Sequence, residues 1–164
     1  MKPRKKMNVS KIKPRPVRLS AAGKRDVRTQ FAALCWRKRR DDVQVLLVTS
    51  RRTGRWVIPK GWPMDGLTPT EAAGQEAWEE AGAEGKVNDT CLGVFTYTKN
   101  MEDDDDLPCA VAVFPMKVKK TRSDWPEVEA RKRKWFSLKK AASQIHEPEL
   151  QRILLTFDPA RLVA

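Results

Sequence analysis

The sequence has few of the residues that mark disulfide-rich, zinc-binding or membrane-spanning proteins. Its three cysteines, Cys35, Cys91 and Cys109, are odd in number and show no CxxC spacing. They are therefore expected to be reduced and mostly buried, as in a cytoplasmic protein. No apolar run approaches the roughly 20 residues that cross a membrane, and the positive N-terminus lacks the apolar stretch of a secretory signal. The single histidine, His146, lies near the C-terminus and is expected on a surface helix, unconnected with chemistry.

The 164 residues include 40% hydrophobic and 33% charged residues, which fits one globular domain with a tail. The net charge of +12 is concentrated at one end of the chain. Residues 1–28 hold eleven Lys/Arg against the single acid Asp26, a net +10. The sequence therefore predicts a basic tail over residues 1–27 and a nearly neutral domain over residues 28–160. Such a tail is either a solvated leader or a weak binder of polyanions such as nucleic acid.

The apolar pattern predicts short strands around one early helix, with two further helices at the end. Asp41 and Asp42 are expected in a turn between the first two strands. This order favours an α/β sandwich over a serially wound βαβ sheet. The expected strands cover residues 31–36, 43–49, 56–58, 92–98, 109–116 and 134–136, and the expected helices cover residues 68–81, 138–145 and 149–157.

The early helix is the most informative element. Thr68 suits its N-cap, Glu71 completes a capping box, and Gly82 suits a left-handed C-terminal stop. At 100° per residue, three glutamates share an arc of about 100°, and small residues lie opposite, at Thr70, Gly74, Ala77 and Ala81. No Lys or Arg occurs between Gly61 and Gly85, so this negative charge needs a counterion. Carboxylates suit hard cations such as Mg²⁺ or Mn²⁺, which predicts a surface-accessible metal cluster of Glu76, Glu79 and Glu80.

The stretch from Gly61 to Ala83 resembles the box of the Nudix (MutT-like) hydrolase family. That box reads Gly-x5-Glu-x7-Arg-Glu-apolar-x-Glu-Glu-x-Gly-apolar, and the three glutamates and both glycines match. Two positions depart from it, because Leu67 replaces the isolated glutamate and Gln75 replaces the arginine. Since both are replaced together, re-engineered support for the helix is favoured over decay. A degenerate, non-catalytic module is the other interpretation.

The resemblance extends over about residues 28–157. The approach Trp56-Val-Ile-Pro-Lys-Gly61 and the segment from Asp124 to Phe136 are similar to diphosphoinositol polyphosphate and diadenosine polyphosphate phosphohydrolases. The resemblance implies an α/β/α sandwich with a mixed central sheet. It also implies a Mg²⁺- or Mn²⁺-dependent hydrolase that cleaves phosphoanhydride bonds in a small polyphosphorylated substrate.

The resemblance also implies roles for single residues. Glu76 and Glu80 would be metal ligands, and Glu79 would take the proton of the attacking water and also touch a metal. The remaining residues would contact substrate: Arg28, Arg51, Lys60 and Arg131 through phosphate, Gly61 through close backbone approach, and Trp62 as either a core residue or a wall of the pocket. The other tryptophans are expected to pack in the core, although one could stack on a base.

The sequence leaves open the role of its acidic run and the choice between a hydrolase and a binding protein. The acidic run Glu102 to Asp106 either faces the site and repels highly charged substrates, or forms a solvated hairpin tip, which is the favoured interpretation. The chain is expected to be a pyrophosphohydrolase acting on a dinucleoside or diphosphoinositol polyphosphate. The alternative is a Nudix-fold regulatory protein that binds such a ligand or nucleic acid without turnover. The sequence leaves the oligomeric state undetermined.

Overall fold

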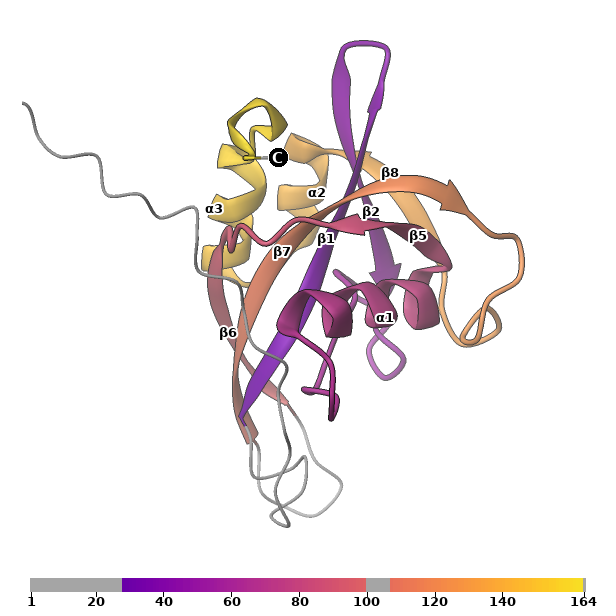
Figure 1. Cartoon of the computed structure of the whole chain (residues 1–164), viewed down its shortest axis with the longest axis vertical. Helices are drawn as coiled ribbons and strands as arrows, with labels where there is room; N and C mark the ends of the chain where they lie inside the picture. Colours follow the sequence, from indigo (N-terminus) through magenta and orange to yellow (C-terminus); the bar gives the residue numbers. More distant parts are fainter. Residues whose placement is uncertain (1–27, 100–106, 164) are drawn as a thin grey trace, which may run out of the picture.

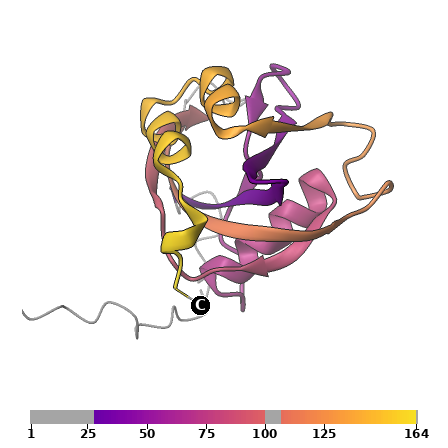
Figure 2. The same cartoon turned by 90° about the horizontal axis from the view of Figure 1, so that it is seen from above.

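A mixed β-sheet lies at the centre of the fold, with helices on both of its faces (Figures 1 and 2). The computed structural model describes residues 28–99 and 107–163. The predicted basic tail and the acidic run at residues 102–106 lie outside the described residues. Within the described part, the strands are β1 (Thr29–Arg39), β2 (Asp42–Thr49), β3 (Trp56–Val57), β4 (Lys60–Gly61), β5 (Ala83–Val87), β6 (Gly93–Lys99), β7 (Leu107–Thr121) and β8 (Arg133–Ser137). The helices are α1 (Pro69–Ala81), α2 (Leu138–Gln144) and α3 (Pro148–Thr156), followed by a short 3-10 helix (Pro159–Arg161).

The order of the main strands is β3-β2-β1-β7-β5, with β8 paired to β2, β6 to β7 and β4 to β1. The central pair, β1 and β7, runs parallel, with Thr29 opposite Ala110 and Trp36 opposite Lys117. The other ladders are antiparallel. The expected α/β/α sandwich with a mixed central sheet is therefore confirmed.

Two hydrophobic cores occupy the two faces of this sheet. One lies under α2 and α3 and includes Leu34, Phe95 and Leu154. The other lies under α1 and includes Phe31, Leu46 and Phe114. Helix α1 contributes only alanines to the second core, at Ala72, Ala73, Ala77 and Ala81. Because these side chains are small, the backbone of α1 lies close to β1 and β4, which are therefore positioned beside its glutamates.

The expected helices and strands are present, but the sheet is larger than the pattern predicts. Strand β4 has only two residues, too few for a periodic signal. Strand β5 contains Gly85 and two charged residues and carries a register shift against β7, so it does not resemble an apolar strand. Strand β7 continues to Thr121 through an exposed polar end. The first turn also differs, because Arg39 already pairs with Asp42, which leaves Arg40 and Asp41 to make the turn.

In the described part of the chain, none of the helices combines the length and the apolar character that a membrane span requires. His146 lies in the connection between α2 and α3 instead of in a helix, and it is exposed. The expectation that it sits on a surface helix is therefore wrong, because the chain leaves α2 at Ile145 and Pro148 starts α3.

Candidate active site

Helix α1 begins and ends where its local sequence predicts. The Thr68 hydroxyl accepts a hydrogen bond from Glu71 N (3.2 Å), and the Glu71 carboxylate accepts one from Thr68 N (3.0 Å). At the other end, Gly82 has φ 62° and its N–H donates to Trp78 O. A side chain at Gly82 would also collide with Trp125 and Arg133. Both ends of the helix that carries the glutamates are thus defined.

Glu80 lies on the buried face of α1 and is only 7% exposed. It follows Ala73 and Ala77 by seven and three residues, so the helical repeat places all three against the sheet. Ala77 was expected opposite the glutamates, and for Glu80 that expectation is wrong because both residues are buried. Its Oε1 accepts a hydrogen bond from Arg131 Nη2 (3.0 Å), and its Oε2 accepts one from Lys60 N (3.2 Å). Burial raises the pKa of the Glu80 carboxyl to about 7, against the opposing effects of Arg131 and Lys60. The expectation that Glu80 belongs to a surface-accessible cluster is therefore wrong.

The guanidinium of Arg131 links three parts of the site. Besides Glu80, it donates to Thr49 O (3.0 Å) and, through Nε, to the carboxylate of Glu127 (3.2 Å). Its side chain is only 11% exposed. Arg51 also lies 3.7 Å from the Glu127 carboxylate. Arg131 thus has three protein acceptors, which supports a role in positioning Glu80 alongside the phosphate contact predicted for it.

The C-terminal end of α1 is held by the connection that follows β7 together with the first residue of β8, which is called the C-terminal clamp below (residues 122–133; Figure 1). The last carbonyls of a helix have no partner within the helix. Here the clamp supplies donors to four consecutive carbonyls: Glu127 N to Glu79 O (3.1 Å), Trp125 Nε1 to Glu80 O (3.0 Å), Arg133 Nη1 to Ala81 O (2.7 Å) and Arg122 N to Gly82 O (2.9 Å). The two neighbouring glutamates therefore sit on a turn of helix that is anchored from outside.

Gly61 and Glu76 fit closely together. A β-carbon at Gly61 would overlap the carboxylate of Glu76. The close backbone approach expected at Gly61 is therefore an approach to a glutamate of α1 in this structure. Contact with substrate stays a prediction for Gly61.

A pocket of about 980 Å³ lies beside Glu80. Of the residues predicted from the sequence, it brings together Arg51, Lys60, Trp62, Glu80 and Arg131. Trp62 thus lines this pocket, and its role as a wall of the substrate site stays a prediction. Four predicted residues are absent from the described lining: Arg28, Gly61, Glu76 and Glu79. Arg28 is exposed and directly precedes β1, and its carbonyl accepts a hydrogen bond from Ala110 N (3.0 Å).

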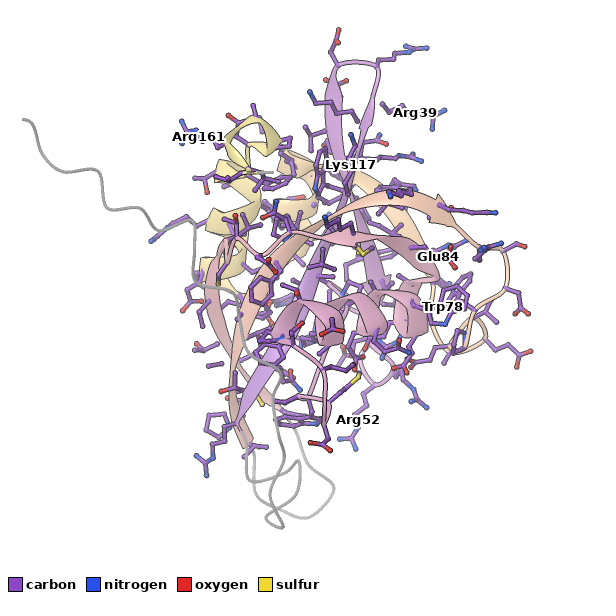
Figure 3. The ribbon with its side chains drawn as sticks, viewed as in Figure 1. Arg39, Arg52, Trp78, Glu84, Lys117 and Arg161 are labelled. Atoms are coloured by element: carbon purple, nitrogen blue, oxygen red, sulfur yellow. The ribbon has the colours of Figure 1, made fainter. Side chains whose placement is uncertain are left out.

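The described lining of this pocket is rich in positive charge. The loop between β2 and β3 contributes Arg51, Arg52 and Arg55. In Figure 3, Arg52 is labelled below helix α1. Lys60, Lys99 and Arg131 add three further cations, against the two acids Glu80 and Glu147. Burial lowers the pKa of the Lys60 ammonium, while Glu80 and Glu147 act in the opposite direction. An excess of cations around a concave space suits a ligand with several negative charges.

A sequence model of the NUDIX domain matches residues 28–157, which include every element of the site. The chain belongs to the Nudix family. The resemblance to the Nudix family is thus confirmed, while hydrolysis by this chain stays a prediction.

Curated Nudix relatives share about a third of their residues with this chain. It is 36% identical over 118 residues to "Nudix hydrolase 12, mitochondrial" of Arabidopsis thaliana, covering 70% of this chain and 58% of that protein. It is 36% identical over 121 residues to "Diphosphoinositol polyphosphate phosphohydrolase 3-alpha" of Mus musculus, covering 71% and 70%. The chain thus spans little more than half of the plant protein. That relative is named mitochondrial, so the cytoplasmic location stays a prediction.

Solved structures support the same fold. An Ap4A hydrolase of C. elegans in a binary complex superposes with a TM-score of 0.60 at 22% identity, covering 79% of this chain and 93% of that one. The dihydroneopterin triphosphate pyrophosphohydrolase of E. coli superposes with a TM-score of 0.63 at 14% identity, covering 80% and 94%. At these identities, the likeness shows the fold alone.

The two departures from the Nudix box have structural counterparts. Gln75 Nε2 donates to Glu79 Oε1 (3.2 Å), so the amide still restrains a glutamate one turn away. Leu67 packs against the core under α1, where a lone carboxylate would lose solvation. Both positions therefore support the helix by other means, which favours re-engineered support over decay.

The donor chemistry of the box fits a hard divalent cation, because three carboxylates lie on one turn of α1. Within the described residues, however, no three acidic, histidine or cysteine side chains are grouped closely enough to hold a metal ion. Glu79 is bonded to Gln75 and Glu80 to Arg131. Each carboxylate keeps lone pairs beyond these hydrogen bonds, so the partners do not themselves prevent Glu76, Glu79 and Glu80 from binding a metal.

Sequence reasoning missed several residues around the pocket. Glu127 belongs to the segment from Asp124 to Phe136, which is similar to the phosphohydrolases, but no role was predicted for it. In the sequence, Arg52, Arg55 and Lys99 cannot be told apart from ordinary surface charges. Glu147 directly precedes a helix, where acidic residues are common, so its place in the pocket could not be predicted. Lys99 and Leu107, at the ends of strands β6 and β7, also line the pocket.

Proposed function

We propose that this chain is a Mg²⁺- or Mn²⁺-dependent pyrophosphohydrolase. Its substrate is a small molecule with a phosphoanhydride bond, either a dinucleoside polyphosphate or a diphosphoinositol polyphosphate. The observation that carries the proposal is the juxtaposition of the buried Glu80 with a cationic pocket of about 980 Å³. The match of residues 28–157 to the Nudix family supports the reaction class.

The roles of the residues follow from their chemistry. When bound, the metal neutralises phosphate oxygens and lowers the pKa of a water molecule. Glu76, Glu79 and Glu80 hold the metal, and Glu79 accepts the proton of the attacking water. Lys60 and Arg51 neutralise and orient the phosphates, with Arg28 and Arg131 as further contacts. Gly61 leaves room for the Glu76 carboxylate, and Trp62 forms one wall of the substrate pocket.

Lys60 is the best supported of the phosphate ligands. Its Nζ lies 5.0 Å from the centroid of the Tyr97 ring, and among the described residues it donates no hydrogen bond to an oxygen. A half-buried ammonium with vacant donors favours an anion from outside the protein. The backbone N–H of the same residue donates a hydrogen bond to the Glu80 carboxylate. Lys60 would therefore bind phosphate with its side chain and position Glu80 with its backbone.

A regulatory Nudix protein that binds its ligand without turnover is the second candidate. Two observations favour it. Glu80 is already paired with Arg131, and no three acids within the described residues form a prepared metal site. Such a protein would use the same cations to hold a polyphosphate, or nucleic acid, without cleaving it.

A substrate panel separates the two candidates. Release of phosphate or pyrophosphate is measured with diadenosine polyphosphates, inositol pyrophosphates, nucleoside triphosphates and ADP-ribose, with Mg²⁺ or with EDTA. We expect Mg²⁺-dependent turnover of at least one substrate, and a loss of two or more orders of magnitude in Glu79→Gln and Glu80→Gln. Glu129→Gln is the matched control, because Glu129 is exposed on the C-terminal clamp and outside the pocket.

Two results would contradict the proposal. Saturable binding of these compounds by wild-type protein, without Mg²⁺-dependent turnover of any of them, would favour the regulatory candidate. Near-wild-type turnover by a folded Glu79→Gln variant would remove Glu79 from the chemistry.

A further inference from the structure

The pocket is lined by two kinds of surface that come from different parts of the fold. The loop between β2 and β3 contributes Arg51, Arg52 and Arg55. Strand β6 and helix α3, which pack against each other, contribute Phe95, Tyr97 and Leu150, and Lys99 lines the pocket at the end of β6. One part of the lining therefore suits phosphate groups, and the other suits an uncharged, partly apolar group.

Glu147 belongs to the second, less polar part of the pocket. It is the N-cap residue of α3, but its side chain makes no capping hydrogen bond. Only its backbone carbonyl is used by the helix, as the acceptor for Gln151 N (3.0 Å). The carboxylate instead lines the pocket together with Leu150, one turn further along α3. Glu147 is therefore a carboxylate available to a ligand.

The positive charge of Lys60 is offset on this side of the pocket. The Lys60 ammonium lies over the Tyr97 ring and interacts electrostatically with both Glu147 and Glu80. By contrast, the arginine loop carries three cations in five residues, and Arg51 is 65% exposed at its side chain. The described lining is thus most positive at the arginine loop and less positive towards α3, where Glu147 and Glu80 offset Lys60.

A carboxylate in such a position accepts hydrogen bonds from hydroxyl and amino groups and repels phosphate. A nucleoside offers both kinds of donor, as well as a flat base that packs on aromatic and aliphatic side chains. A polyphosphorylated ring carries phosphate on nearly every side. Any orientation that fills the pocket would therefore bring one of these phosphates towards the Glu147 carboxylate.

We infer that Glu147 determines substrate specificity, by selecting a nucleoside-linked polyphosphate over a polyphosphorylated ring. The phosphates face Arg51, Arg52 and Arg55, and the uncharged nucleoside lies between Tyr97 and Glu147. This inference rests on the proposed function, because it assumes that the pocket is the substrate site. It narrows that function to one of its two substrate classes.

The test is a comparison of affinities that does not need turnover. Dissociation constants of diadenosine tetraphosphate and inositol hexakisphosphate are measured in EDTA for wild-type protein, Glu147→Gln and Glu147→Lys. Glu149→Lys is the matched control, since Glu149 is an exposed acid on the same helix and outside the described lining. Where turnover exists, kcat/KM for diadenosine tetraphosphate and a diphosphoinositol polyphosphate gives a second readout.

We expect wild-type protein to prefer the dinucleotide, and Glu147→Lys to shift the ratio of the two dissociation constants at least tenfold towards the inositol phosphate. Glu147→Gln should shift it a few-fold, and Glu149→Lys should have little effect. The shift should shrink as salt rises, because charge interactions at the pocket mouth are screened.

Three results would overturn the inference. They are a wild-type preference for the inositol phosphate, an unchanged ratio in folded Glu147 variants, and an equal shift in Glu149→Lys. An unchanged ratio together with a lower melting temperature would assign Glu147 to stabilisation of the N-terminus of α3. Absence of turnover with a shifted ratio of affinities would refute the proposed hydrolysis and leave the specificity inference standing.

Discussion

Glu80 combines two properties at the scale of a single residue, since it is buried and it belongs to the acidic set of the Nudix box. Its pKa is raised from 4.5 to about 7, chiefly by burial. Between these pH values, the folded protein holds a proton on Glu80 that the unfolded chain has already lost. The free energy of unfolding contributed by Glu80 therefore falls as pH rises through this window.

The first prediction follows from that sign. In EDTA, the wild-type free energy of unfolding should decrease more between pH 5 and pH 8 than that of Glu80→Gln, which cannot titrate at this position. Urea unfolding at the two pH values measures the difference. Glu129→Gln should follow the wild type, because its carboxylate is exposed. Parallel pH dependence of wild type and Glu80→Gln would contradict the raised pKa.

A second prediction concerns the fit between Gly61 and Glu76. A methyl group at residue 61 would overlap the Glu76 carboxylate, so Gly61→Ala must displace that side chain. Under the proposed function, we expect Gly61→Ala to lower Mg²⁺-dependent kcat at least tenfold while the protein stays folded. Steady-state kinetics and circular dichroism measure the two effects.

Gly74→Ala is the control for this glycine substitution. Its added methyl group would meet only Val87, at 3.2 Å, and alanine favours the helical backbone at this position. Its activity should stay within a few-fold of wild type. Equal activity losses in Gly61→Ala and Gly74→Ala would remove the special role of the Gly61–Glu76 fit.

At the scale of elements, the C-terminal clamp explains why the glutamate helix and the segment at residues 122–133 belong together. The helix ends with free carbonyls, and the clamp has donors at the matching positions. The Arg133 guanidinium also lies 4.0 Å from the centroid of the Trp125 ring, which stiffens the clamp. The position of Glu79 and Glu80 therefore depends on residues some fifty positions later in the chain.

The third prediction tests this dependence. Trp125→Phe removes the donor to Glu80 O but keeps an aromatic ring in the core. Leaving a buried carbonyl without its partner should reduce the free energy of unfolding by about 1–3 kcal/mol. Because the glutamates shift with the helix end, kcat should fall more than KM rises. Chemical denaturation and steady-state kinetics check these two effects.

Trp36→Phe provides the matched substitution. Trp36 is also buried, but its Nε1 has no hydrogen-bond partner among the described residues. The same chemical change there removes no hydrogen bond, so stability should change less and kcat should remain near wild type. If both variants lose kcat alike, general packing rather than the clamp is responsible.

At the scale of the whole molecule, the charge is divided between a folded domain and a basic N-terminal segment. The Nudix match begins at residue 28, so residues 1–27 lie outside both the match and the described structure. We propose that this segment binds polyanions weakly and is not required for chemistry. The net charge of +10 in the first 28 residues supports polyanion binding.

The fourth prediction follows. Deletion of residues 1–24 should leave hydrolysis of a small substrate within a few-fold of wild type, because the segment has too few apolar residues to join a core. The deletion should also flatten the salt dependence of binding to nucleic acid or polyphosphate, since fewer counterions are released. Unfolding of the truncated chain would instead make the segment structural.

Features that depend on local interactions could be predicted from the amino-acid sequence. The capping box at Thr68, the stop at Gly82 and the 3.6-residue repeat of α1 involve neighbours in the chain, and all of them appear in the structure. The Nudix resemblance is local in the same sense, since it rests on residue spacing within one loop and helix. For this reason the family and the fold class could be predicted.

Contacts between residues far apart in the sequence became visible only in the folded protein. The pairing of Glu80 with Arg131, the clamp on α1, the parallel contact of β1 with β7 and the place of Glu147 in the pocket all join residues far apart in sequence. No periodicity encodes such contacts, because each depends on how the whole sheet is assembled. The burial of Glu80 is the clearest case: the helical repeat places it beside the alanines, but only the position of Arg131 and of the Lys60 backbone makes a buried carboxylate stable there.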